Sequence, residues 1–246
     1  ELGVDLSLVK ASGVKGRIII TDIKDYVKDN LTNINTASLE VEKIAIKKTQ
    51  AAGIKNIINT WQDKPHLYQF DEVNVDQMQD FLLNQDAQQV KISVLAFVMK
   101  VLVRVLKNNP LFNAALDKDA KNILVKKYYN FAFAVNVENS HSIAIIKNVE
   151  KKSLIDISRE IDELIKNAKF VELTDDLKEI SFLIFAFTDL SSAHFTALVS
   201  PINVATLGIA KIQKKPYWNG ENFIPINSMP VSLSCDGRVI NNFQAA

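Results

Sequence analysis

The sequence predicts an α/β protein with a mixed sheet, preceded by a small all-α unit. Two observations predict this fold. From about residue 42 onward, segments with a helical period alternate with short apolar runs that are typical of buried strands. The first 30 residues differ from the rest, since three of the seven glycines lie within the first sixteen positions. Interleaved helices and strands favour a sheet with both parallel and antiparallel pairs.

Residues 1–30 are predicted to form a loop followed by a short helix. Thr21 is a suitable N-cap, and Asp22 favours the first turn of a helix. Residues 31–41 are small and polar without a period, so we expect a linker there. Residues 42–246 then form the second, larger domain.

The larger domain contains three predicted helices, at 48–60, 92–106 and 152–168. The second of these is well marked, because its apolar residues recur on one face and Asn109-Pro110 follows it. The predicted strands are 67–75, 131–137, 143–146, 182–187, 204–210 and 231–235.

Composition excludes several classes of protein. Among 246 residues, 29 basic and 28 acidic side chains give a net charge of +1, which favours neither a nucleic-acid nor a membrane partner. Cys235 is the single cysteine, so the chain cannot form an internal disulfide. The longest apolar stretch, 92–106, is too short to cross a bilayer. No signal peptide or metal-binding motif is evident. We therefore expect a protein that is not secreted, cytoplasmic if bacterial and in the mitochondrial matrix if eukaryotic.

Several fragments, in this order and spacing, resemble the dihydrolipoamide acyltransferase component of 2-oxo acid dehydrogenase complexes. Residues 1–6 and 16–18, with Asp22-Ile23, are similar to the peripheral-subunit-binding domain of that family. The larger domain matches it at Pro65-His66, 109–113, 151–160, 216–220 and 230–234.

The resemblance implies a chloramphenicol-acetyltransferase-like core, assembled as trimers within a larger cage. It implies a lipoyl domain upstream of residue 1 and a final helix after Ala246. Residues 1–30 would bind the decarboxylase component, dihydrolipoamide dehydrogenase, or both, and Lys10, Lys15 and Arg17 would form the basic docking patch. The complex would be of the pyruvate type or a related 2-oxo acid type.

The family moves an acyl group between dihydrolipoamide and coenzyme A. A histidine deprotonates the attacking thiol, and a serine or threonine of the neighbouring subunit stabilises the oxyanion. The family motif is Asp-His-Arg-x-x-Asp (or Asn)-Gly, and residues 236–242 match it at Asp236, Arg238 and Asn241. The histidine position holds Gly237, and the serine position of the strand at 182–186 holds Phe185. Neither replacement can perform its expected step.

Three hypotheses follow for the larger domain. The first is a subunit with the fold and the docking unit but impaired or absent catalysis. The second is an active enzyme with a relocated base, for which His141 or His194 is the candidate. His66 and Cys235 are expected to be structural. The third is a scaffold unrelated to the complex.

Overall fold

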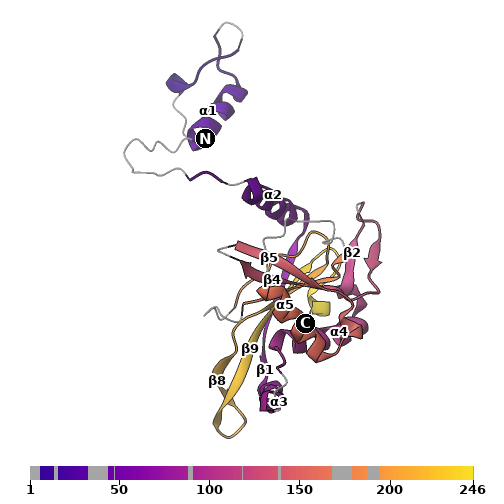
Figure 1. Ribbon diagram of the computed structural model, residues 1–246. Helices are drawn as coiled ribbons and strands as arrows, with labels where there is room; N and C mark the ends of the chain where they lie inside the picture. The colour runs from indigo at the N-terminus through magenta and orange to yellow at the C-terminus, as the bar shows by residue number, and fades with distance from the viewer. Residues whose placement is uncertain are drawn as a thin grey trace. The chain divides into compact units, whose positions relative to one another are not determined.

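A computed structural model shows two compact units, Glu1–Lys47 and Lys48–Ala246, which are described separately (Figure 1). The structure describes residues 6–13, 16–32, 44–46, 48–87, 91–117, 119–137, 140–167, 179–187 and 194–245.

The first unit contains a short 3-10 helix, Leu6–Leu8, and helix α1, Ile20–Thr32. The predicted loop and helix are confirmed, but two boundaries were wrong. The helix begins at Ile20, so Thr21 lies inside it and is not the N-cap. It ends at Thr32, so the first two residues of the predicted linker are helical. The remainder of the predicted linker, 33–41, lies outside the described residues.

The described residues of the second unit form five α-helices: α2 (Lys48–Asp63), α3 (Asp76–Ala87), α4 (Val94–Asn108), α5 (Leu154–Lys166) and α6 (Asn242–Ala245). Side-chain caps explain where two of them begin. The Ser93 hydroxyl accepts a hydrogen bond from the Ala96 N–H at the start of α4. Ser153 and Asp156 form a capping box at the start of α5. The three predicted helices are confirmed, whereas α3 was not predicted.

The main sheet has the strand order β1-β9-β7-β6-β4-β5. β8 pairs with the N-terminal part of β9, residues 223–228. β4, β6 and β7 are parallel to one another and the other pairs are antiparallel, which confirms the mixed sheet. A separate hairpin pairs β2 with β3 and was not predicted. The strands are β1 (His66–Asn74), β2 (Ala114–Leu116), β3 (Ile123–Val125), β4 (Phe131–Val137), β5 (Ser140–Ile146), β6 (Phe182–Ala186), β7 (Ala205–Ile209), β8 (Gln213–Trp218) and β9 (Phe223–Asp236).

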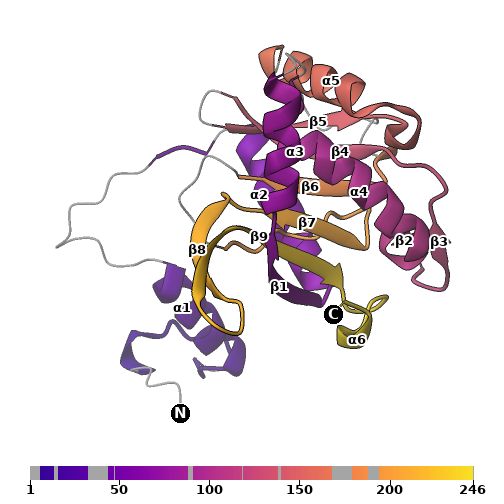
Figure 2. The same ribbon diagram turned by 90° about the horizontal axis from the view of Figure 1, so that it is seen from below.

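The larger core lies on one face of the sheet, beneath α4 and α5 (Figure 2). Buried residues from both helices and from β4 and β6 form it, among them Met99, Ile157, Phe131 and Phe182. The opposite face has a smaller cluster around Ala132, Ile180 and Leu183. Within the described residues, no helix is both long and apolar enough to cross a membrane.

Candidate functional site

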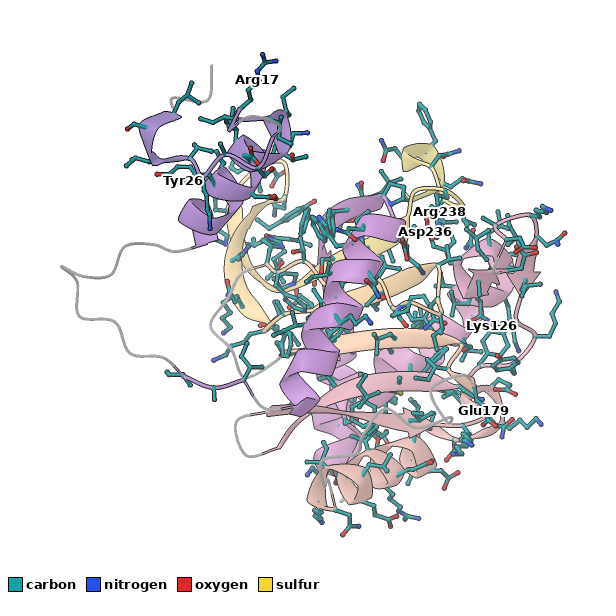
Figure 3. All side chains as sticks on the ribbon, turned by 90° about the horizontal axis from the view of Figure 1, so that it is seen from above. Arg17, Tyr26, Lys126, Glu179, Asp236 and Arg238 are labelled. Atoms are coloured by element: carbon teal, nitrogen blue, oxygen red, sulfur yellow. The ribbon has the colours of Figure 1, made fainter. Side chains whose placement is uncertain are left out.

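The turn formed by the motif residues 236–242 follows β9 and is centred on an ion pair whose carboxylate is buried (Figure 3). Asp236 is 1% exposed, and Arg238 donates to both of its carboxylate oxygens, from Nε at 2.9 Å and from a terminal nitrogen at 2.7 Å. The Lys64 ammonium lies 3.8 Å from the same carboxylate. Burial alone would raise the pKa of Asp236, but the Arg238 hydrogen bonds and the charges of Arg238 and Lys64 lower it.

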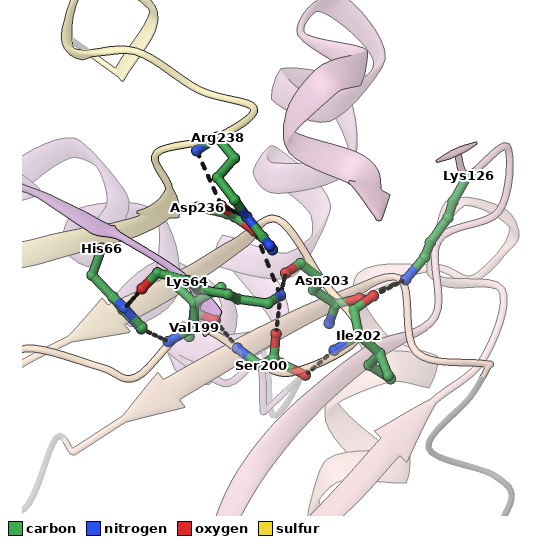
Figure 4. Close-up of polar contacts among 10 residues, drawn as sticks. Lys64, His66, Lys126, Val199, Ser200, Ile202, Asn203, Asp236 and Arg238 are labelled. Carbon is green, nitrogen blue, oxygen red and sulfur yellow. Dashed lines mark hydrogen bonds and ion pairs between the residues drawn. The ribbon is translucent and has the colours of Figure 1, made fainter. Parts of the chain in front are cut away.

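Two lysines, the buried Lys64 and the half-buried Lys126, hold the segment 199–203, which precedes β7 (Figure 4). Lys64 donates to the carbonyl oxygens of Ser200 and Asn203, both at 2.8 Å. Lys126 donates to the carbonyl of Ile202 at 3.1 Å and to Oδ1 of Asn203 at 2.5 Å. Burial lowers the pKa of each lysine to about 8. Because their hydrogens are directed at protein oxygens, these ammonium groups tie chain segments together.

Gly237 lies against the backbone of the segment that leads into β1. Its N–H donates to the Pro65 carbonyl oxygen at 2.7 Å. A Cβ atom at position 237 would lie 2.9 Å from that oxygen and 3.3 Å from Cγ of Leu67. Position 237 therefore offers no side-chain proton acceptor, and a side chain there would require its neighbours to shift.

Asn241 caps helix α6. Its Oδ1 accepts a hydrogen bond from the Gln244 N–H at 2.9 Å, and the Gln244 side chain accepts one from the Asn241 N–H at 3.0 Å. This reciprocal pair has the geometry of a capping box. The Oδ1 atom of Asn241 is thus engaged within its own turn.

His66 has both ring nitrogens occupied. Nδ1 lies 2.7 Å from the Lys64 carbonyl oxygen, so it donates there, and Nε2 accepts from the Val199 N–H at 3.1 Å. The ring also stacks between Trp61 and Tyr68, at centroid distances of 5.1 and 5.8 Å. These contacts confirm a structural histidine with a fixed neutral tautomer.

Phe185 lies on β6, paired with Gly208 of β7, which in turn pairs with Ser232 of β9. Its ring is half-buried against the smaller core and lies 6.0 Å from the Phe187 ring. Phe185 is two strands from β9, and Ser232 is five residues before Gly237. With strands about 4.8 Å apart and a rise of about 3.3 Å per residue, Phe185 and Gly237 are roughly 20 Å apart in one chain.

His194 lies against strand β1, far along the sheet from the motif residues 236–242. Its Nε2 is 3.3 Å from the Glu72 carboxylate, and its ring meets Phe70 edge-on at 6.0 Å. It lines a shallow, open surface depression together with Phe195, Gly208 and Ser232. Glu72 pairs with Pro230, six residues before Asp236, so His194 is about 20 Å along the strand from the motif turn.

The remaining predicted residues are placed as follows. His141 pairs with Asn136 in the β4–β5 register, and its side chain is outside the described part of the structure. Cys235 is 1% exposed, which confirms the expected burial, and that burial raises the pKa of its thiol to about 12. Lys10 and Arg17 are exposed in the first unit, and Lys15 is outside the described residues.

The sequence analysis did not predict the role of Lys64 and its partners. The one feature of the sequence that could have indicated it is the position of this lysine directly before Pro65.

Comparisons with known proteins agree with this fold. Residues 38–246 match the family described as 2-oxoacid dehydrogenases acyltransferase (catalytic domain). The chain is 35% identical, over its whole length, to the acetyltransferase component of the pyruvate dehydrogenase complex of Buchnera aphidicola subsp. Schizaphis graminum. That match covers 66% of the relative. The corresponding component of Cupriavidus necator is 32% identical and is covered over 50% of its length.

Solved structures give the same result. The Azotobacter vinelandii dihydrolipoamide acetyltransferase superposes with a TM-score of 0.79 at 30% identity, over 86% of this chain and 89% of that one. Chloramphenicol acetyltransferase superposes at 0.54 with 14% identity, which supports the fold alone. The chain spans about half to two thirds of the length of the curated relatives above. Because the family match covers most of it, the chain belongs to the 2-oxoacid dehydrogenase acyltransferase (catalytic domain) family.

Proposed function

We propose that this chain is a core subunit of a pyruvate dehydrogenase complex that does not itself perform acyl transfer. The observation that carries this proposal is Gly237. A residue without a side chain stands at the base position, where a Cβ atom would lie 2.9 Å from the Pro65 carbonyl oxygen. Without a base the thiol stays protonated, and the thiolate is the nucleophile.

The Azotobacter vinelandii relative supports this assignment of positions. Its structural and enzymatic study concerns the catalytic roles of one serine, one histidine and one asparagine. Phe185, Gly237 and Asn241 have the same spacing along this chain as those three residues have in the relative. Two of the three roles would therefore be vacant here, and the third residue caps a helix. A site that unites positions 185 and 237 needs a second chain, because they are far apart in one.

The expected loss of rate is large. A positioned base contributes roughly 10²- to 10⁴-fold, and an oxyanion donor roughly 10²- to 10³-fold. The two losses need not multiply, since such groups act as a unit. Even the smaller figure leaves turnover at least about 10²-fold below that of an active relative.

The remaining functions would then be structural. A solved relative of 30% identity forms the cubic core of the pyruvate dehydrogenase multienzyme complex. By analogy, the second unit would assemble as trimers within a cage. Residues 1–30 would act as the peripheral-subunit-binding domain that docks the decarboxylase or dihydrolipoamide dehydrogenase, with exposed Lys10 and Arg17 in its basic patch.

The decisive experiment measures acetyl transfer from acetyl-coenzyme A to dihydrolipoamide by the assembled full-length protein. The Azotobacter vinelandii enzyme at equal subunit concentration is the positive control. We expect a rate at least about 10²-fold lower than that control. A rate within tenfold of the control would refute the proposal.

A second candidate function is active acyl transfer with a relocated base. The contact between His194 and Glu72 favours it, because a carboxylate can orient an imidazole for proton transfer. The His194→Asn variant distinguishes the two candidates. If the wild type turns over and this variant does not, the chemistry depends on His194 and the scaffold proposal fails.

A further inference from the structure

Residues 194–199 form an irregular segment against the sheet, and its two ends are held differently. Ala197 and Val199 are buried, and the Val199 N–H donates to Nε2 of His66 at 3.1 Å. In the described part of the chain, no backbone hydrogen bond fixes residues 194–196. These three residues therefore form a strap that is anchored firmly at its C-terminal end.

The ring of Phe195 covers the hydroxyl of Ser232 on strand β9. Both groups lie around the point where a Cβ atom of Gly208 would be, at 2.9 Å for Cζ of Phe195 and 2.3 Å for Oγ of Ser232. Ser232 is 2% exposed, and within the described residues its Oγ has no hydrogen-bond partner. A buried hydroxyl without a partner costs free energy that contact with water would recover. The hydroxyl that the strap covers therefore opposes its closed position.

Glu72 of strand β1 holds the other end of the strap. Its Oε1 lies 3.3 Å from Nε2 of His194, whose ring meets Phe70 edge-on. In the described part of the chain, the same carboxylate also contacts the Lys215 ammonium of β8 and accepts a hydrogen bond from the Ser228 hydroxyl of β9 at 3.0 Å. The hydrogen bonds from Lys215 and Ser228 lower the pKa of Glu72. The carboxylate is therefore charged throughout the range in which histidine side chains titrate.

We propose that residues 194–196 are a strap that opens and closes over Ser232, with the contact between His194 and Glu72 as its catch. A charged imidazolium binds a carboxylate more strongly than a neutral imidazole does, so proton uptake favours the closed position. Histidine side chains change charge between about pH 5 and 8, so opening increases as the pH rises through this range. His194 and Glu72 are 36% and 37% exposed, and solvent screening limits the change to about two- to fivefold. The strap acts in this way whether or not the chain performs acyl transfer.

A thiol placed at position 232 reports the opening, because it can react with a labelling reagent only while the strap is open. The full chain with Ser232→Cys is treated with iodoacetamide at about pH 6 and pH 8. Each rate is divided by that of free cysteine at the same pH, since the thiolate is the reactive form. The chain without this substitution gives the background from Cys235, which is 1% exposed and reacts only when the sheet itself opens.

The catch is tested by Glu72→Gln and His194→Gln in the Ser232→Cys background. Each should raise the corrected rate at pH 6 by about two- to fivefold and remove its dependence on pH. Asp162→Asn is the matched control, because Asp162 forms an exposed ion pair with Lys91 at 3.6 Å, away from the strap. It should leave both rates unchanged.

The cover is tested by Phe195→Ala in the same background, which should raise the rate at least about tenfold at both pH values. An unchanged rate in this variant would show that Phe195 does not shield position 232, and the strap would be refuted. If both glutamine variants keep the pH dependence of the parent, the catch is wrong. If a variant raises the Cys235 background by the same factor, the protein has unfolded more widely, and opening of a strap is again refuted.

Discussion

Replacing Gly237 with alanine tests how closely the base position is packed. The backbone at 237 is outside the left-handed region, so alanine can adopt it without strain. A Gly→Ala change of this kind normally stabilises a protein by about 0.4–1 kcal/mol, because the unfolded chain loses entropy. Here the new Cβ would lie 2.9 Å from the Pro65 carbonyl oxygen. Overpacking typically costs about 1–3 kcal/mol. We therefore expect a net loss of about 1–2 kcal/mol.

Urea denaturation followed by tryptophan fluorescence measures this loss. Both tryptophans, Trp61 and Trp218, belong to the second unit, so the signal reports the unit that contains position 237. Repeating Gly237→Ala in a Leu67→Ala background separates the two close contacts. The cost should persist there, since a backbone oxygen cannot be truncated.

A gain of about 0.4–1 kcal/mol for Gly237→Ala would refute the reasoning, because it would show that the site accepts a side chain freely. The same result would remove the steric obstacle to Gly237→His. If instead the loss is confirmed, exogenous imidazole should also fail to restore acyl transfer, since no space is available where the histidine ring would begin.

Three further predictions concern neighbouring contacts. Gly208→Ala should destabilise the protein by about 1–3 kcal/mol, because its Cβ would lie 2.3 Å from the Ser232 hydroxyl. In urea denaturation, adding Ser232→Ala should restore part of the lost stability, and additive effects of the two substitutions would contradict the contact. Burial lowers the pKa of Lys64 in the folded protein to about 8, from 10.5 in the unfolded chain. The unfolded chain therefore binds more protons between these two values, and the free energy of unfolding should rise as the pH increases from 8 to 10.5. Urea denaturation of Lys64→Met should show a weaker rise over that window, and an unchanged slope would contradict the assignment. Asn241→Ala should lower helix content at the C-terminal end and cost about 1 kcal/mol, whereas Asn241→Asp should retain the cap; equal losses in both variants would argue against capping.

Periodicity predicted most of the fold because most elements of the second unit bury one clear face. Helix α4 buries Ala96, Met99, Val103 and Leu106, spaced three or four residues apart, and its predicted and observed ranges nearly coincide. Helix α3 was missed because, among its described side chains, only Met78 is buried and polar residues surround it in the sequence. The β2–β3 hairpin was missed because its strands have three residues each, too few to show an alternation.

The surroundings of the site were harder to predict, since its contacts join distant parts of the sequence. The hydrogen bond from Lys64 to Asn203 spans 139 positions, and that from Lys126 to the same residue spans 77. A lysine in the sequence gives no sign of whether it is solvated or buried with its hydrogens on carbonyl oxygens. The choice of positions 185 and 237, by contrast, came from the motif alone, and their loss of catalytic roles stays a prediction.

The matching residues of the motif do not by themselves indicate activity, because the structure gives each of them another role. Asp236 and Arg238 form a bidentate ion pair whose carboxylate is buried, so removing Arg238 would leave the Asp236 charge with fewer hydrogen bonds in a buried position. Asn241 caps α6. Their contribution to the stability of the turn is therefore enough to explain why these three residues occupy their positions, whether or not the turn takes part in catalysis. Position 237 differs, since a histidine there would contribute nothing to the ion pair or the cap. The acyl-transfer assay, rather than the partial motif match, is what decides between a structural and a catalytic subunit.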